Sequence, residues 1–105
     1  MLAQMTQDIT AEIFNFQIKV SINRAVDNQK TVTEMIKCLE NNAGKFDSIQ
    51  LDISEVEFVN TFFINGLIRI KHQFATPVSL IGVNPSIREL LRISNIDRII
   101  PIIPN

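Results

Sequence analysis

Hydrophobic residues recur along this chain with two spacings, every second residue in some stretches and every third or fourth in others. These spacings are typical of strands and helices respectively. The first alternation predicts a strand with one buried face; its apolar positions are Phe14, Phe16, Ile18 and Val20. The first helical spacing comes next, at Val32, Met35, Ile36 and Leu39. We expect this helix to begin near Thr31 or Thr33. Its end is expected at Asn41, Asn42 and Gly44, since Asn and Gly tolerate the left-handed conformation that follows many helices.

Residues 51–70 join a strand pattern to a helix pattern through a short acidic loop. Apolar and polar residues alternate around 49–53, and the apolar residues of 61–74 keep helical spacing. The change falls at Asn60 and Thr61, so the Thr61 hydroxyl sits where the helix is expected to begin. Such a hydroxyl can cap the helix, or it can accept a phosphate beside free backbone N–H groups.

A third strand and helix follow Pro77. Residues 78–83 predict the strand, and Asn84-Pro85 combines an N-cap residue with a proline at the first helical position. The expected inner stripe of this helix is Ile87, Leu90 and Leu91. The apolar, proline-containing end at 99–105 is expected to be a short docked tail.

Three strands alternating with three helices predict an α/β fold with a parallel core sheet and right-handed crossovers. Residues 4–9 are expected to add an antiparallel edge strand. A chain of 105 residues suits one compact domain, which we place at 1–105.

Composition excludes several functional classes. Lys and Arg number 10 against 11 Asp and Glu, without a basic run, so neither nucleic acid nor an anionic membrane is an expected partner. No stretch reaches the ~18 apolar residues of a membrane-spanning helix, and the first ten residues lack signal-peptide character, so we expect a cytoplasmic protein without membrane insertion. The single cysteine, Cys38, cannot form an internal disulfide and is expected to be buried or half-buried.

No catalytic or metal-binding arrangement is visible in the sequence. Asp52, Glu55 and Glu57 lack a histidine or a further acid at ligand spacing, so no metal is expected. His72, the only histidine, falls late in a helix pattern, where a surface role near the helix end is the default. Without a nucleophile–base pair or a glycine-rich phosphate loop, we expect neither turnover nor a cofactor.

Two stretches resemble the STAS domain family (sulfate transporter and anti-sigma factor antagonist). In that family a hydrophobic strand leads through a loop to Asp-Ser-Ser/Thr-Gly and then to a Leu/Val-rich helix. The matching positions here are Asn60, Thr61, Phe62 and Phe63. The stretch PVSLIGVNPSIRELLRISNIDRIIPI is similar to the family's ending, a strand, Val-Asn/Ser-Pro, a helix and a Leu/Ile-Asp-Arg-Ile turn. The resemblance covers roughly 13–102 and implies a small mixed, mainly parallel sheet with helices packed mostly on one side.

The resemblance also implies a role for Thr61. In anti-sigma factor antagonists the matching serine is phosphorylated by a partner kinase that is also the anti-sigma factor. A phosphate in the first turn of the helix gains from free N–H donors and the helix dipole, and its charge of about −2 changes any partner surface there. The sequence departs from the motif because Asn60 replaces the acid and Phe63 replaces the glycine. A capping role for Thr61 therefore stays as the alternative.

Helical phase separates Phe62 from Phe63. At about 100° per residue, Phe63 falls on the apolar stripe, whereas Phe62 falls with Arg69 on the polar side. We expect Phe63 in the core. A large ring on a polar face suits a partner anchor, although a lone exposed aromatic is the simpler alternative. The expected partner surface comprises the 54–62 loop and the residues Asn60, Thr61, Phe62 and Arg69.

Two functions follow from the resemblance. The first is a non-enzymatic regulatory protein that sequesters a kinase-like anti-sigma factor and loses this contact when Thr61 is phosphorylated. The second is a STAS subunit of a membrane-associated lipid ABC transport complex, since some stand-alone STAS proteins of this kind carry threonine at the same position. In the second case Thr61 would pack at a subunit interface. A small enzyme is disfavoured by the missing catalytic arrangement.

Overall fold

The computed structural model describes residues 1–23 and 27–104. One sheet carries all five named strands, and its strand order follows the chain order. The elements are β1 (Leu2–Met5), β2 (Ile9–Phe14), β3 (Gln17–Ile22), α1 (Asn28–Asn41), β4 (Ser48–Asp52), α2 (Thr61–Phe74), β5 (Val78–Ile81), α3 (Pro85–Ile93) and the short 3₁₀ helix η1 (Ile96–Arg98).

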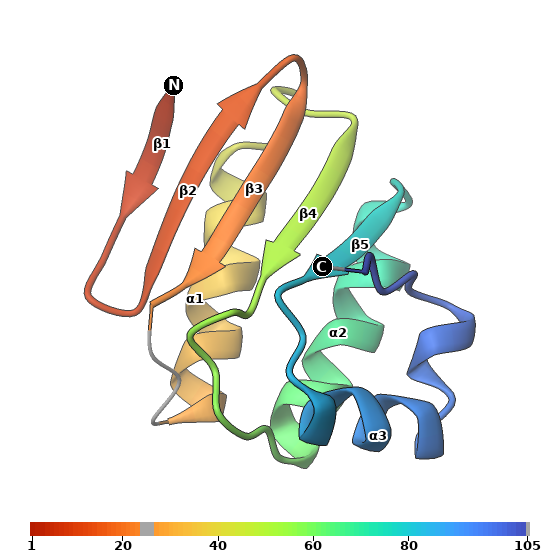
Figure 1. Ribbon diagram of the computed structural model, residues 1–105. Helices are drawn as coiled ribbons and strands as arrows, with labels where there is room; N and C mark the ends of the chain where they lie inside the picture. Colours follow the sequence, from red (N-terminus) through yellow and green to blue (C-terminus); the bar gives the residue numbers. More distant parts are fainter. Residues whose placement is uncertain (24–26, 105) are drawn as a thin grey trace.

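The sheet is mixed in equal parts. β1 pairs with β2 and β2 with β3 in antiparallel fashion, whereas β3 with β4 and β4 with β5 are parallel. The expectation of a mainly parallel sheet is therefore wrong, although the α/β fold is confirmed. The two crossovers place α1 and α2 on one face of the sheet, with α3 beyond its lower end (Figure 1). Because β3, β4 and β5 pair in parallel, their carboxyl ends lie at the same end of the sheet.

The first expected strand is wrong because the chain reverses inside it. Asn15 and Phe16 have φ of 50° and 61°, and positive φ at both central residues is what a tight two-residue hairpin requires. Phe14 ends β2, Phe16 lies in the turn, and their side chains are 75% and 68% exposed. Neither belongs to the buried face. The expected antiparallel edge strand is present as β1, but it spans Leu2–Met5 instead of 4–9, and Ile9 already begins β2.

Helix boundaries agree with the sequence at most ends. α1 begins before Thr31, because the Asp27 side chain caps it by accepting a hydrogen bond from Lys30 N–H (3.1 Å). The buried Thr31 hydroxyl donates to the Asp27 carbonyl oxygen instead (2.9 Å). The other predicted helix ends are confirmed: α1 ends at Asn41, α2 spans 61–74, and α3 starts at Pro85 after the N-cap Asn84.

A single hydrophobic core lies between the sheet and the helices. Its members include Ile18, Val20, Leu51 and Leu80 from the sheet and Leu39, Phe63 and Leu67 from the helices. The docked tail is confirmed, since Ile100 is fully buried and Ile102 bridges to Leu80 of β5. In the part of the chain that the structure describes, no helix combines the length and apolar character needed to cross a membrane.

Candidate partner-binding site

The site predicted from the sequence lies where β4 passes through the 53–60 loop into α2. The starts of α1 and α3 reach the same end of the sheet (Figure 1). The geometry of this region follows from three asparagines, each at or beside the start of a helix: Asn28, Asn60 and Asn84.

Asn60 is the N-cap of α2, and this separates the two interpretations of Thr61. The extended backbone of Asn60 (φ −118°, ψ −174°) lets its side-chain oxygen accept a hydrogen bond from Phe63 N–H at 3.3 Å. Thr61 is the first helical residue and is exposed. Within 1–23 and 27–104 its hydroxyl has no hydrogen-bond partner. The capping role expected as an alternative for Thr61 therefore belongs to Asn60.

Asn28 and Asn84 hold the loop from two sides. The Asn28 side-chain oxygen accepts a hydrogen bond from Asn60 N–H at 2.8 Å, and Asn28 is 3% exposed. The Asn84 amide donates to the carbonyl oxygens of Val56 and Glu57, at 3.1 Å each. The Asn84 oxygen at the same time caps α3 by accepting from Ile87 N–H (2.8 Å). The loop that leads directly into Thr61 is thus held by hydrogen bonds from the starts of both α1 and α3.

Gly82 makes room for this loop. Its φ is +70°, and a Cβ atom built there would lie 2.8 Å from the backbone nitrogen of Ser54. Ser54 N–H in turn donates to the Asp52 carboxylate at 3.0 Å, and that carboxylate also pairs with Lys19 at 3.7 Å. The loop turn therefore packs directly against the end of β5.

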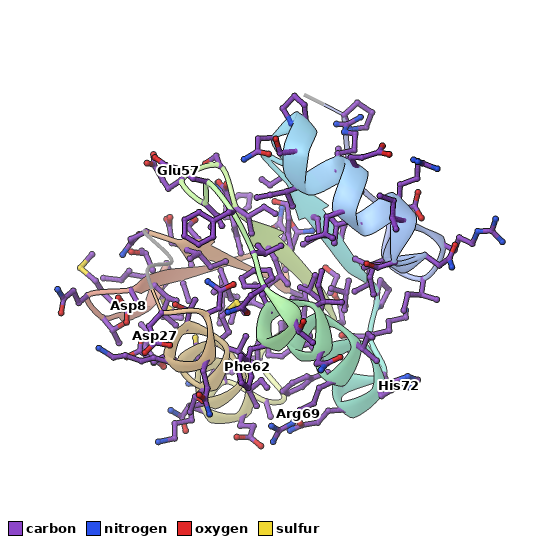
Figure 2. All side chains as sticks on the ribbon, turned by 90° about the horizontal axis from the view of Figure 1, so that it is seen from below. Asp8, Asp27, Glu57, Phe62, Arg69 and His72 are labelled. Atoms are coloured by element: carbon purple, nitrogen blue, oxygen red, sulfur yellow. The ribbon has the colours of Figure 1, made fainter. Side chains whose placement is uncertain are left out.

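Phe62 and Arg69 line one shallow groove between α1 and α2, as their common helical phase predicted. The groove has a volume of about 230 Å³. Its floor includes Gly66, where a Cβ atom would lie 2.6 Å from a Val32 methyl carbon, so glycine lets the two helices approach closely. Figure 2 shows Phe62 and Arg69 at the α1–α2 side of the molecule. Phe62 is 56% exposed and Phe63 is fully buried, which confirms the phase assignment of both rings.

A second depression, lined in part by Thr61, lies between the start of α2 and α3. Its volume is about 340 Å³, and its apolar lining residues are Val59, Ile64 and Leu90. Leu90 was expected on the inner stripe of α3; that expectation is wrong, because Ile87 and Leu91 alone face the core and Leu90 is 36% exposed. Thr61 lines this mainly apolar depression, and the next residue, Phe62, lines the groove that contains the Arg69 cation.

Sequence reasoning missed two features of this region. Asn28 lies in a polar stretch without periodicity, so nothing marked it as a buried contact to a loop 32 residues away. Phe58 is a large exposed ring on the loop itself, three residues before Thr61. No clear signal in the sequence marked Phe58, because it lies between Val56 and Val59 in the loop and its exposure could not be inferred from spacing.

The remaining residues of chemical interest lie apart from this surface. His72 is exposed in the last turn of α2, and Figure 2 shows it well separated from Glu57 on the loop. Within the described residues, no three His, Cys, Asp or Glu side chains gather to hold a metal ion. Cys38 is buried in α1, and this burial raises the pKa of its thiol, while a hydrogen bond from Asn42 opposes the shift.

Comparisons with known proteins agree with this architecture. The family model described as "STAS domain" matches residues 4–105. The chain belongs to the STAS domain family. Among curated proteins no sequence gives a significant match.

Solved structures with the STAS fold are similar over nearly the whole chain. A Thermotoga maritima protein assigned as an anti-sigma factor antagonist superposes with a TM-score of 0.81 at 19% identity, over 94% of this chain and 88% of that one. A variant of RsbS from Moorella thermoacetica gives 0.73 at 23% identity, covering 92% and 86%. The anti-sigma factor antagonist SpoIIAA in its unphosphorylated form gives 0.67 at 12% identity, covering 87% and 96%. At these identities the likeness establishes the STAS fold of this chain.

Proposed function

We propose that this STAS domain is a non-enzymatic regulatory binding protein whose contact with a protein partner is switched by phosphorylation of Thr61. The observation that carries the proposal is the separation of roles at the start of α2. Asn60 caps the helix, so the exposed Thr61 hydroxyl is not needed for folding. Exposed Phe58 and Phe62, three residues before and one residue after Thr61 in the sequence, supply apolar contact area for a partner.

Charge explains how the switch acts. The first turn of α2 carries no acidic side chain, so a phosphate on Thr61 meets the positive end of the helix dipole without a carboxylate in the same turn. The modification adds a charge of about −2 to a surface that includes the apolar lining of the neighbouring depression. A partner packed on that lining would have to desolvate the phosphate. Phosphorylation therefore favours dissociation.

The fold that this chain shares with anti-sigma factor antagonists supports a proposal for the class of the partner. We propose a kinase-fold anti-sigma factor, held by the unmodified protein and released when Thr61 is phosphorylated. The Thermotoga protein assigned as an anti-sigma factor antagonist and SpoIIAA share this fold, which supports the assignment of class without naming a partner.

For the test, the kinase is any kinase-fold protein encoded near this protein's gene. Incubation with that kinase and ATP should add one phosphate to the unaltered protein and none to Thr61→Ala, and the modified protein should lose kinase binding. Thr61→Ser is the matched control that keeps a hydroxyl. Phosphate appearing equally in Thr61→Ala would exclude Thr61 as the acceptor.

A second function, a subunit of a lipid ABC transport complex, is favoured by one observation. The depression beside Thr61 is lined by Val59, Ile64 and Leu90, which suits permanent packing against another subunit. The response to ATP and the kinase distinguishes the two functions, and Thr61→Val is the matched variant because it keeps the shape of the side chain and removes the hydroxyl. A phosphorylation switch predicts that ATP and the kinase release the partner from the unaltered protein and not from Thr61→Val. A packing role predicts that they affect the assembly of neither protein.

A further inference from the structure

β1 leaves one edge of the sheet open, whereas the opposite edge is closed. Residues 101–103 run along β5, where Leu80 N–H donates to the Pro101 carbonyl oxygen (2.9 Å) and Ile103 N–H donates to the Leu80 carbonyl oxygen (2.8 Å). No residue within 1–23 and 27–104 pairs with the outer side of β1, the outermost strand in Figure 1. An open edge offers backbone N–H and C=O groups to another strand.

The outward backbone groups of β1 can be assigned from its hydrogen bonds. Met1 donates to the Ile13 carbonyl oxygen (3.0 Å) and its own carbonyl accepts from Ile13 N–H (2.8 Å). Just beyond the strand, Thr6 N–H donates to the Ile9 carbonyl oxygen (2.8 Å). Inward and outward directions alternate along an antiparallel strand. The backbone groups of Leu2 and Met5, the neighbours of these inward residues, therefore point away from the sheet.

A β-bulge then places the side chains of these same two residues on one face. The register shifts between Leu2 and Gln4, so that Leu2 lies opposite Glu12 and Met5 opposite Thr10. In a regular strand, residues three apart would point to opposite faces. Here both point to the face without helices, and they are 57% and 66% exposed. The edge thus offers two apolar side chains beside its unpaired backbone groups.

We propose that β1 pairs in antiparallel fashion with β1 of a second copy of this chain. In the register we infer, Leu2 lies opposite Met5 of the partner subunit, and Met5 lies opposite Leu2 of the partner subunit. This register is symmetric about a two-fold axis. Because the backbone groups of Leu2 and Met5 both point outward, each of these pairs exchanges two backbone hydrogen bonds. Four apolar side chains meet on one face of a continuous ten-stranded sheet.

Two further observations favour a second copy as the occupant. Residues 1–7 carry no charged side chain, so two copies of β1 meet without like-charge repulsion between side chains. The charged side chains that commonly prevent pairing at a sheet edge are missing from these residues. The tail on β5 blocks the other edge of each subunit. The pairing therefore closes at two copies and does not continue into a fibre.

The oligomeric state of the protein in solution tests the proposed β1 interface. Sedimentation velocity over a concentration series should show the unaltered protein forming a dimer. Leu2→Lys combined with Met5→Lys should remain monomeric at the concentrations where the unaltered protein is dimeric. The matched control is Ile93→Lys on α3, which places a lysine at another exposed apolar position (64% exposed) and should still dimerise. A protein that is monomeric throughout, or a dimer that the two lysines leave intact, overturns the proposal.

The register has its own test, which also guards against misfolding of the lysine variant. Leu2→Cys combined with Met5→Cys should form disulfide-linked dimers on mild oxidation, because each cysteine faces one of the partner. Either single variant should not, since equivalent residues lie about 9–10 Å apart along the paired strands, beyond the ~7 Å reach of a disulfide. Buried Cys38 does not compete. Equal cross-linking by a single variant overturns this register.

Discussion

Phe62 and Phe63 are adjacent in sequence and differ completely in their surroundings. Phe63→Ala should lower the free energy of unfolding by ~3–5 kcal/mol, because it empties a fully buried ring position in the core. Phe62→Ala should leave stability almost unchanged. It should instead weaken binding of the proposed kinase partner by at least roughly 2 kcal/mol, about thirtyfold in affinity. Thermal melts and titration calorimetry separate the two effects. Equal destabilisation by both variants would contradict the assignment.

Cys38 should make stability fall at high pH. Burial raises the pKa of its thiol above the ordinary value for cysteine. Once the pH passes that ordinary value, the unfolded chain loses this proton while the folded protein keeps it. The unfolded state then binds fewer protons, and the free energy of unfolding falls as pH rises, by up to about 1.4 kcal/mol per pH unit. Urea titrations between about pH 8 and pH 10 measure this slope.

The control for this pH dependence is Cys38→Ala, which should flatten the slope while lowering stability at neutral pH through a small cavity. The chain contains no tyrosine, so no phenol titrates in the same range. An unchanged slope in Cys38→Ala would show that Cys38 is not the source of the alkaline loss.

Among single residues, periodicity predicted burial well and hydrogen-bond partners poorly. The stripe containing Phe63 and Leu67 was readable because helical phase alone assigns a face. The role of Asn28 could not be predicted from the sequence, because its hydrogen bond with Asn60 N–H depends on how α1 packs beside a distant loop. Thr61 was placed correctly at the start of α2. Whether Thr61 or Asn60 caps this helix could not be predicted, because the answer depends on the side-chain geometry of Asn60.

Among the elements, the hairpin between β2 and β3 shows why alternation can mislead. Phe14, Phe16 and Ile18 alternate with polar residues without a break, although the chain reverses at Asn15-Phe16. A tight hairpin of this kind normally shows itself by Asn-Gly, and here a phenylalanine occupies the second position. The parallel half of the sheet was predictable because each crossover helix had its own periodicity and end signals.

The close packing of the loop on β5 gives a matched pair of glycine variants. Gly82→Ala should destabilise the protein more than Gly44→Ala, because both residues have positive φ but only Gly82 lies against another segment. A Cβ atom at Gly44 would have no neighbouring atom within 4 Å, so its substitution should cost only the ~1–2 kcal/mol of a left-handed backbone. Urea unfolding compares them. Equal losses would mean that the Ser54 backbone moves aside easily.

At the scale of the whole molecule, the candidate surfaces lie on different parts of the fold. The candidate partner-binding site around Thr61 lies at the carboxyl ends of β4 and β5, whereas β1 lies on the far side of the antiparallel half of the sheet (Figure 1). The parallel half positions the candidate switch through its loops and helix starts. The antiparallel half supplies the open edge. A dimer formed through β1 therefore leaves Thr61 exposed in both copies, and each copy can engage its own partner.

Closure of the β5 edge by the tail leads to a prediction about assembly. Deleting residues from 101 onward removes both hydrogen bonds to Leu80 and leaves each sheet with two open edges. The buried Ile100 is retained, so the core should persist, with some loss of stability from the missing Ile102 contact. With two open edges, self-association no longer stops at two copies, and species larger than a dimer should appear in sedimentation velocity.

Adding Leu2→Lys and Met5→Lys to the shortened chain should remove the larger species, because only the β5 edge then remains open. If the shortened chain keeps the association state of the full one, the tail does not protect this edge.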